Sequence, residues 1–150
     1  MTRARLPIIL IGTTLIALGL TACEKPNPGA SVFSGTTSKF SRAVCWADEG
    51  QSIDAAACAK DLLAKDSVPT IPVVPGQVVG ISVDPVVADA GWTPRINDQP
   101  LTQRPITSTY FRFTFPEFQD VPADGLSMQL VAGADQATRG VWVFKLSPPA

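Results

Sequence analysis

The amino-acid sequence predicts a mainly β protein, an immunoglobulin-like β-sandwich with one short α-helix. Apolar and polar side chains alternate through about seven short segments, which is the pattern of half-buried strands. Turn-forming Gly, Pro, Asn and Asp residues separate these segments about every eight to twelve positions, as in sandwich domains of this size. The stretch at about residues 52–65 has helical character instead, and we expect a disulfide to staple it to a neighbouring strand.

The first 22 residues predict a secretory signal peptide. Arg3 and Arg5 supply a charged start, and an apolar stretch over residues 7–22 follows them. These sixteen residues would span about 24 Å as a helix, which is shorter than the roughly 30 Å hydrocarbon core of a bilayer. We therefore expect residues 1–22 to be removed on secretion. The alternative is an uncleaved N-terminal helix, which leaves the rest of the chain on the same side of the membrane.

Cys23 is the predicted site of lipid attachment. The run Leu20-Thr21-Ala22-Cys23 resembles the lipobox of bacterial lipoproteins, in which the Cys sulfur receives diacylglycerol before cleavage at its amine. The resemblance implies a lipoprotein, anchored by lipid chains such as palmitate to the outer face of the cell membrane. Residues 23–31 are rich in Pro, Asn and Gly and form the expected tether. Residues 32–150 are long enough for a single domain.

The composition of the chain excludes several functions. It has 12 Lys and Arg, 13 Asp and Glu, and no His, for a formal net charge of −1. Because no basic run is present to neutralise a row of phosphates, we expect no nucleic-acid partner. The absence of His removes the commonest general base and the commonest metal ligand at neutral pH. We expect no metal and no cofactor.

The expected strands differ in how they bury their side chains. In residues 108–115 the Phe residues at alternate positions face inward, while Tyr110, Arg112 and Thr114 face outward. Residues 140–146 are apolar on both faces, which predicts a central strand. Prolines confine residues 68–74 to a sheet edge. The other expected elements are strands at 32–33, 39–46, 77–83, 92–96 and 126–131, a helical turn after Asp84-Pro85, and a tight turn at Asn97-Asp98.

The predicted helix contains one of the two cysteines of the expected disulfide. Ser52 is the expected N-cap, Asp54 lies in the first turn where the helix dipole favours a negative charge, and the helix ends at about Lys65. Cys45 ends a strand, and Cys58 follows thirteen positions later within this helix. Outside the cytoplasm two thiols at this spacing should pair. A redox-active or metal-binding pair is the alternative, and the lack of a C-x-x-C motif and of His disfavours it.

Taken as a whole, the mature chain resembles a group of small actinobacterial lipoproteins of unknown function, each with one domain behind the anchor. The resemblance implies an envelope location and the disulfide, and implies no activity or ligand. The segments that carry it are Cys23-Glu24-Lys25-Pro26, Cys45 with the turn at 46–50, Cys58, residues 80–85, residues 88–92 and residues 140–146.

No catalytic constellation is recognisable. A Ser or Cys nucleophile needs a nearby base, and neither G-x-S-x-G nor S-x-x-K is present to place one. Asp84, Asp89 and Asp98 could serve a hydrolase with paired carboxylates, although each has an explanation as a cap or turn residue. The D-x-D spacing of calcium loops is absent. We therefore expect a protein that is not an enzyme.

The tryptophans and the single tyrosine are the remaining residues with potential for recognition, because their rings offer large rigid faces with a polar tip. We expect Trp46 and Trp142 to lie in the core, while the position of Trp92 after Gly91 leaves both core and surface open. The predicted binding patch consists of Trp92, Arg95, Arg104, Tyr110 and Arg112.

The leading functional hypothesis is a non-catalytic accessory module that binds an envelope protein or a wall glycan. A surface inhibitor of a secreted protease is the first alternative, because residues 97–106 form a loop rich in Pro, Gln and Arg. A carboxylate-dependent hydrolase is the second. A sandwich fold hosts all three classes, so the fold alone does not rank them.

Replacing the lipobox cysteine tests the predicted anchor. In Cys23→Ala the acceptor sulfur is missing, so the protein should no longer incorporate a labelled fatty acid. Metabolic labelling with a palmitate analogue measures this incorporation. Undiminished labelling in Cys23→Ala would contradict the assignment.

Overall fold

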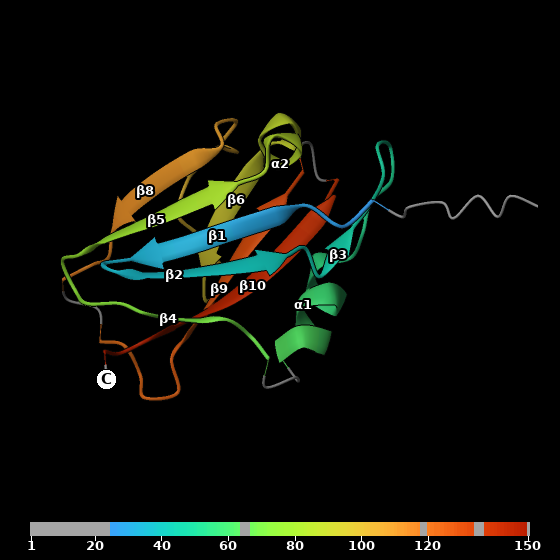
Figure 1. Ribbon diagram of the computed structural model, residues 1–150. Coiled ribbons are helices and arrows are strands. Elements are labelled where there is room, and N and C mark those ends of the chain that lie inside the picture. The colour runs from blue at the N-terminus through green and yellow to red at the C-terminus, as the bar shows by residue number, and fades with distance from the viewer. Residues whose placement is uncertain (1–24, 64–66, 118–119, 134–136, 150) are drawn as a thin grey trace, which may run out of the picture.

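The computed structural model describes residues 25–63, 67–117, 120–133 and 137–149. Two antiparallel sheets pack face to face, with two short helices at their periphery (Figure 1). The predicted signal peptide and the predicted lipid attachment site at Cys23 lie outside the described residues. Within those residues, neither helix is long and apolar enough to cross a bilayer.

Sheet A has four strands in the spatial order β2-β1-β5-β8, and sheet B has six, of which β4 runs parallel to β10. The strands of sheet A are β1 (Gly29–Ser34), β2 (Thr37–Arg42), β5 (Val78–Val83) and β8 (Tyr110–Thr114). The strands of sheet B are β3 (Cys45–Trp46), β4 (Thr70–Pro72), β6 (Trp92–Ile96), β7 (Gln99–Pro100), β9 (Leu126–Ala132) and β10 (Gly140–Ser147). The helices are α1 (Ala55–Leu63) and α2 (Pro85–Ala90).

The core lies between the sheets and is built largely by alternate residues of β1, β5, β6, β9 and β10. In β9 every second side chain from Leu126 to Ala132 is buried, while the residues between them are half-buried. The same period of two appears in β5, where Val79 and Ile81 are completely buried. In these strands one set of alternate side chains thus faces the opposite sheet, which confirms the predicted mainly β sandwich.

Two buried tryptophans tie irregular segments to this core. Trp142 and Trp92 are both fully buried, so their indole N–H groups need acceptors inside the protein. Trp142 Nε1 donates to the carbonyl of Pro28 at 3.0 Å, and Trp92 Nε1 donates to the carbonyl of Ser108 at 2.9 Å. The first bond fixes the chain before β1, and the second fixes it before β8.

Several sequence predictions are confirmed. Strands occur at the expected places in β5, β6, β8, β9 and β10, and β10 is buried on both faces. The Pro-containing β4 lies at an edge, where it pairs with β10 alone. Asn97 and Asp98 form the expected tight turn, both with positive φ.

The single strand predicted at 39–46 is wrong. The chain leaves sheet A after Arg42 and enters sheet B at Cys45, so the segment forms β2 and β3. Ala43 and Val44 make the crossing, and the Ala43 N–H donates to Pro28 O while the Val44 N–H donates to Val141 O. Two adjacent residues therefore bond to different sheets, which a continuous strand does not allow.

Two predicted boundaries also shift. Asp54, rather than Ser52, caps α1, because its carboxylate accepts hydrogen bonds from the N–H groups of Ala56 and Ala57 at 2.9 and 3.1 Å. Nearer the N-terminus, β1 begins at Gly29 with Ala30 fully buried, so the last three residues of the predicted tether, 29–31, belong to the sandwich.

Asp84 precedes Pro85 at the start of α2, as expected, but its carboxylate does not cap that helix. It accepts a hydrogen bond from the N–H of Gly29 at 2.7 Å instead. The carboxylate therefore joins the beginning of β1 to the end of β5.

Helix α1 covers the outer side of β10. Val141 and Val143 point away from the space between the sheets and are nevertheless fully buried. Ala59 of α1 lies over them, together with Ile53 and Val68 from the flanking loops. An apolar strand face that would otherwise meet water is thus covered by the helix.

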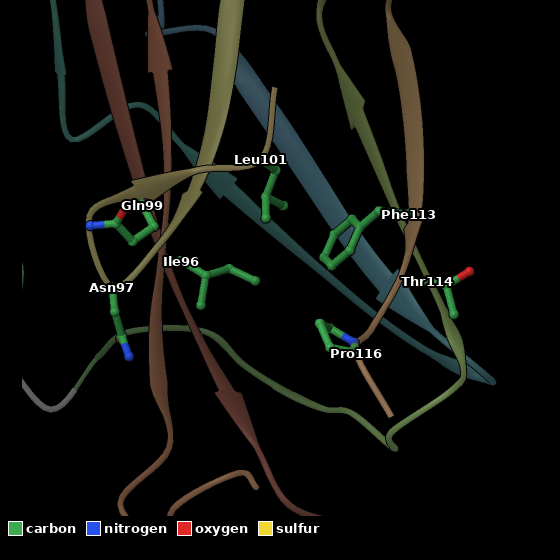
Figure 2. Close-up of a pocket in the computed structure, with 7 residues that line it drawn as sticks. All are labelled: Ile96, Asn97, Gln99, Leu101, Phe113, Thr114 and Pro116. Carbon is green, nitrogen blue, oxygen red and sulfur yellow. The ribbon is translucent and has the colours of Figure 1, made fainter. Parts of the chain in front are cut away.

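The two sides of the sandwich differ. On the β2 side, β4 runs alongside β2 and β1. On the β8 side the sheets leave a cavity of about 460 Å³, with Phe113 and Leu101 facing each other across it (Figure 2). Ile96, Asn97, Gln99, Thr114 and Pro116 complete its lining.

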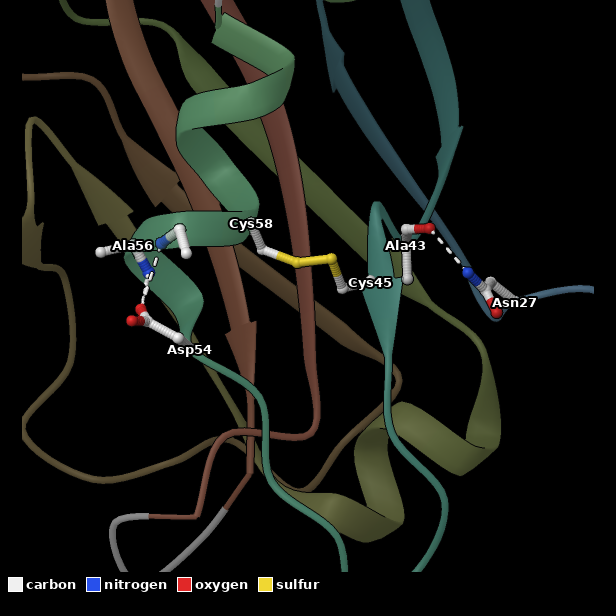
Figure 3. The surroundings of a disulfide bond; sticks show 7 residues. Asn27, Ala43, Cys45, Asp54, Ala56 and Cys58 are labelled. Atoms are coloured by element: carbon white, nitrogen blue, oxygen red, sulfur yellow. Dashed lines mark hydrogen bonds between the residues drawn. A yellow bond between two sulfur atoms is a disulfide. The ribbon is translucent and has the colours of Figure 1, made fainter.

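The predicted disulfide is present between Cys45 and Cys58, with the Cα atoms 6.2 Å apart (Figure 3). It links β3, at the edge of sheet B, to α1, which lies over the outer side of β10. The bond therefore holds the covering helix against the sheet.

Removing the disulfide should destabilise the domain without changing its fold. In the chain-entropy model a cross-link that closes a loop of this length contributes about 3 kcal/mol. We expect Cys45→Ser/Cys58→Ser to lose about that much unfolding free energy in urea denaturation. The reduced wild-type protein is the matched control and should behave like the double variant. Equal stability of the oxidised wild type and the double variant would contradict the proposed role.

Candidate functional site

The outer face of sheet A carries the exposed aromatic side chains of the described chain. We call it the aromatic face and define it by Phe33, Phe40, Val78, Tyr110, Arg42 and Arg112. Phe40, Val78 and Tyr110 are 58%, 49% and 48% exposed, which is high for large apolar side chains. Exposed large apolar side chains gathered on one face of a sheet indicate an interaction surface.

Strand register places these residues on one side. Phe40 of β2 is opposite Ser31 of β1, Ser31 is opposite Ser82 of β5, and Ser82 is opposite Tyr110 of β8. Residues that are directly opposite point to the same side of a sheet, so this row crosses all four strands. Its two aromatic ends are separated by three strand spacings, or about 14 Å. The next row contains Phe33, Gly80 and Arg112.

Two glycines let the rings lie close to the backbone. A Cβ atom on Gly80 would overlap the ring of Phe33, and one on Gly29 would overlap the ring of Phe40. The Phe33 ring also lies beside that of Tyr110, with centroids 6.1 Å apart and planes only 13° from parallel. Because glycine has no side chain at these two positions, the two rings can lie directly over the strand backbone.

The charge on this sheet has one sign. Its four strands contain Lys39, Arg42 and Arg112, and none contains Asp or Glu. The Arg42 guanidinium lies 5.7 Å from the centroid of the Phe40 ring and donates to the carbonyl of Asn27. Arg112 is exposed at the centre of β8. The exposed carboxylate of Asp84, just after β5, lies beside Gly29 at the Phe40 end of the face. The two arginines still favour an acidic or electron-rich ligand, although the whole chain is slightly acidic.

Hydroxyl groups occupy the positions between the rings. Ser38, Ser82 and Thr114 are exposed, and Ser31 is half-buried between Phe40 and Ser82. A hydroxyl both donates and accepts a hydrogen bond. The face therefore combines apolar ring surfaces, polar groups that bond in either direction, and fixed positive charge.

The five residues of the predicted patch lie in different places. Tyr110 and Arg112 lie on the aromatic face. Trp92 is fully buried in the core, with its ring edge-on to Phe111 at 6.3 Å, so it is no part of the surface. Of the two tryptophans assigned to the core, Trp142 is fully buried, whereas Trp46 is only half-buried at its margin.

Arg95 and Arg104 lie away from the aromatic face. Arg95 points to the outer side of sheet B, the opposite layer, where it lines a cavity of about 520 Å³ beside α1. That cavity mixes the acidic Asp54 and Asp98 with the basic Lys60. Arg104 is exposed in the loop between β7 and β8.

The loop of the protease-inhibitor hypothesis, residues 97–106, is tied to β6 at both ends. Leu101 N–H donates to the carbonyl of Pro94 at 2.9 Å, and Ile106 forms a bridge with Trp92. Gln103, Arg104 and Pro105 between these points are exposed.

The three aspartates of the hydrolase hypothesis do not form one cluster. Asp84 and Asp89 lie at the start and within α2, whereas Asp98 lies beyond the far end of β6. The length of β6 therefore places Asp98 roughly 17 Å from the two aspartates at α2. Across the described ranges, no three His, Cys, Asp or Glu side chains are grouped so that they could hold a metal ion.

Sequence reasoning missed Phe33, Phe40 and Arg42 as part of the site. Their positions in the sequence did not show which strands pair with β8. A partial signal was present, because Gly80 interrupts an otherwise apolar strand and such a glycine often marks a close approach by another group.

No protein-family model, curated protein or solved structure matches this chain. The arguments for function therefore rest on the geometry and chemistry of the aromatic face.

The contact between Phe33 and Tyr110 is testable because Tyr110 is the only tyrosine in the chain. Replacing Phe33 with Leu removes the neighbouring ring current, so the ring-proton signals of Tyr110 should shift. Phe144→Leu, a change in the core between the sheets, should leave those signals nearly unchanged. Nuclear magnetic resonance of protein labelled only at tyrosine measures the shift, and an unchanged Phe33→Leu spectrum would contradict the stacking.

Proposed function

We propose that this protein is a non-catalytic, lipid-anchored accessory module of the cell envelope that binds acidic wall polysaccharide. The binding surface is the aromatic face of sheet A. The observation that carries the proposal is the row of Phe40, Ser31, Ser82 and Tyr110 across four paired strands, flanked by Arg42 and Arg112.

A polysaccharide suits this combination of groups. The C–H-bearing faces of sugar rings pack on aromatic rings, and the hydroxyls between those rings can be bonded by Ser and Thr. Carboxylate or phosphate substituents would pair with the arginines, whose guanidinium groups match such anions in geometry. The absence of carboxylates from the strands of sheet A supports a negatively charged ligand over a neutral one.

The anchor supports the same assignment. The predicted lipid at Cys23 holds the chain at the outer face of the membrane. Lys25 to Pro28 precede β1, and the last of these residues is fixed to the core by Trp142. The free tether is therefore short, which keeps the domain close to the membrane and beneath or within the wall.

We also propose that the sandwich is of the immunoglobulin type. In that type strands B and E pair in one sheet, and strands C, F and G lie together in the other. The pairing of β5 with β8, and the adjacency of β6, β9 and β10, follow this pattern in the same chain order. The buried Trp92 in β6 supports it, because immunoglobulin domains bury a Trp in strand C. The disulfide of this chain differs from the usual bond between strands B and F.

Binding to purified cell-wall polysaccharide tests the proposed function. Phe40→Ser/Tyr110→Ser removes the rings at both ends of the row, and Arg42→Gln removes one cation. Central aromatic groups of a binding surface commonly contribute more than about 1–2 kcal/mol each, so we expect the double variant to bind at least about tenfold more weakly. Co-sedimentation with insoluble wall material measures the affinity.

Lys60→Gln is the matched control for charge, because Lys60 is exposed on α1 in the opposite layer. It should bind like the wild type, whereas Arg42→Gln should bind more weakly and lose much of its salt dependence. Equal binding by the wild type and the double aromatic variant would disprove the proposed surface. If a protein rather than a glycan bound to this face, the proposed class of ligand would be wrong.

A further inference from the structure

We infer that the free edge of β8 and the cavity beside it form a second binding site, which takes an extended peptide as an added strand of sheet A. The observation concerns the backbone edge and the inner side of β8, and Arg112 is the residue that this site shares with the aromatic face. Strand addition of this kind uses main-chain hydrogen bonds for affinity and side-chain pockets for specificity.

The ladder with β5 shows which backbone groups are free. Val83 N–H donates to Thr109 O and Phe115 N–H donates to Gln77 O, so odd-numbered residues of β8 bond to β5. The N–H and C=O groups of Arg112 and Thr114 must then point to the other side. Within the part of the chain that the structure describes, these four groups have no hydrogen-bond partner.

This edge has little of the usual protection against pairing. Natural edge strands are short, carry Pro, charged side chains or bulges, or are covered by another segment. β8 has five residues, no Pro and one charged side chain, Arg112, whereas the opposite edge strand β2 has β4 alongside it (Figure 1). In the immunoglobulin type a further strand, D, pairs with this side of strand E. No strand of the described ranges occupies that position.

The cavity of about 460 Å³ lies where an added strand would place its inward side chains. Phe113 of β8 and Pro116 just beyond that strand line one side, and Ile96 of β6 and Leu101 just after β7 line the other (Figure 2). None of its lining residues is charged, and Asn97 and Gln99 supply amide groups at one end. Its size lies in the range of pockets that hold small ligands, so an apolar side chain fits.

Charge complementarity defines the rest of the peptide. Arg112 is the only charged residue of β8 and points outward, so the peptide residue directly opposite it should be acidic. The neighbouring peptide residue, opposite Phe113, points inward and should be apolar. The occupant is therefore an extended segment of a partner protein in which an acidic residue is adjacent to a large apolar one.

A synthetic capped peptide, Thr-Thr-Val-Glu-Leu-Thr-Val, provides the test with the folded domain. We expect it to bind and to slow hydrogen exchange at the amides of Arg112 and Thr114. The variant Thr114→Pro removes one free N–H without touching the ladder to β5, a position where sheets tolerate proline. It should bind at least about tenfold more weakly. Lys60→Gln, which changes an exposed residue of α1 in the opposite layer, is the control and should bind like the wild type.

A change in the peptide covers the case in which Thr114→Pro fails to fold. Methylation of the Glu amide nitrogen blocks the hydrogen bond to Arg112 O and should weaken binding to the wild-type protein to a similar extent. Exchanging the Glu for Lys should weaken it several-fold. No binding at about 1 mM peptide, equal binding by the methylated peptide, or protection confined to residues outside β8 would each overturn the inference.

Discussion

The apolar outer side of β10 is the constraint that determines how the two layers of this protein are used. Val141 and Val143 face away from the sandwich and are completely buried, although this side of a sheet would ordinarily face water. The chain covers them with α1, and the Cys45–Cys58 disulfide fixes that helix to β3. Sheet B therefore has its central strand covered on both sides. Within the described residues, no helix covers the outer face of sheet A in this way, and its aromatic side chains are exposed.

The surface of sheet A follows from small residues as much as from aromatic ones. Gly29 and Gly80 leave room for the rings of Phe40 and Phe33 to lie on the strands, and serines separate the aromatic ends of the row. The edge of the same sheet exposes the backbone of Arg112 and Thr114 beside an uncharged cavity. One strand, β8, thus contributes its outer side chains to one proposed site and its backbone and inner face to another.

Local sequence patterns predicted most individual elements and few of the relations between them. The alternation around Phe111 and Phe113, the Asn97-Asp98 turn and the two cysteines carry their information within short segments. The crossing at Ala43 and Val44 was missed because apolar spacing continues through it, although the hydrogen bonds change sheets. The outward direction of Tyr110 and Arg112 was predictable, because side chains alternate between the two faces along a strand. Their neighbours were not, because strand register brings Phe33 beside Tyr110, and Phe40 onto the same face, from about seventy positions away. Trp92 was misplaced in the predicted patch because its local context does not show that β6 packs against β8.

The most direct measurement of the central claim is a map of backbone amide shifts on titration with soluble acidic wall polysaccharide. If the aromatic face is the binding surface, the shifted amides will belong to β1, β2, β5 and β8, with the largest changes near Phe40, Ser82 and Tyr110. The amides of α1 and of β10 will remain unchanged, because they lie on the opposite layer. Shifts concentrated in α1, or in the loop at residues 97–106, would contradict the account.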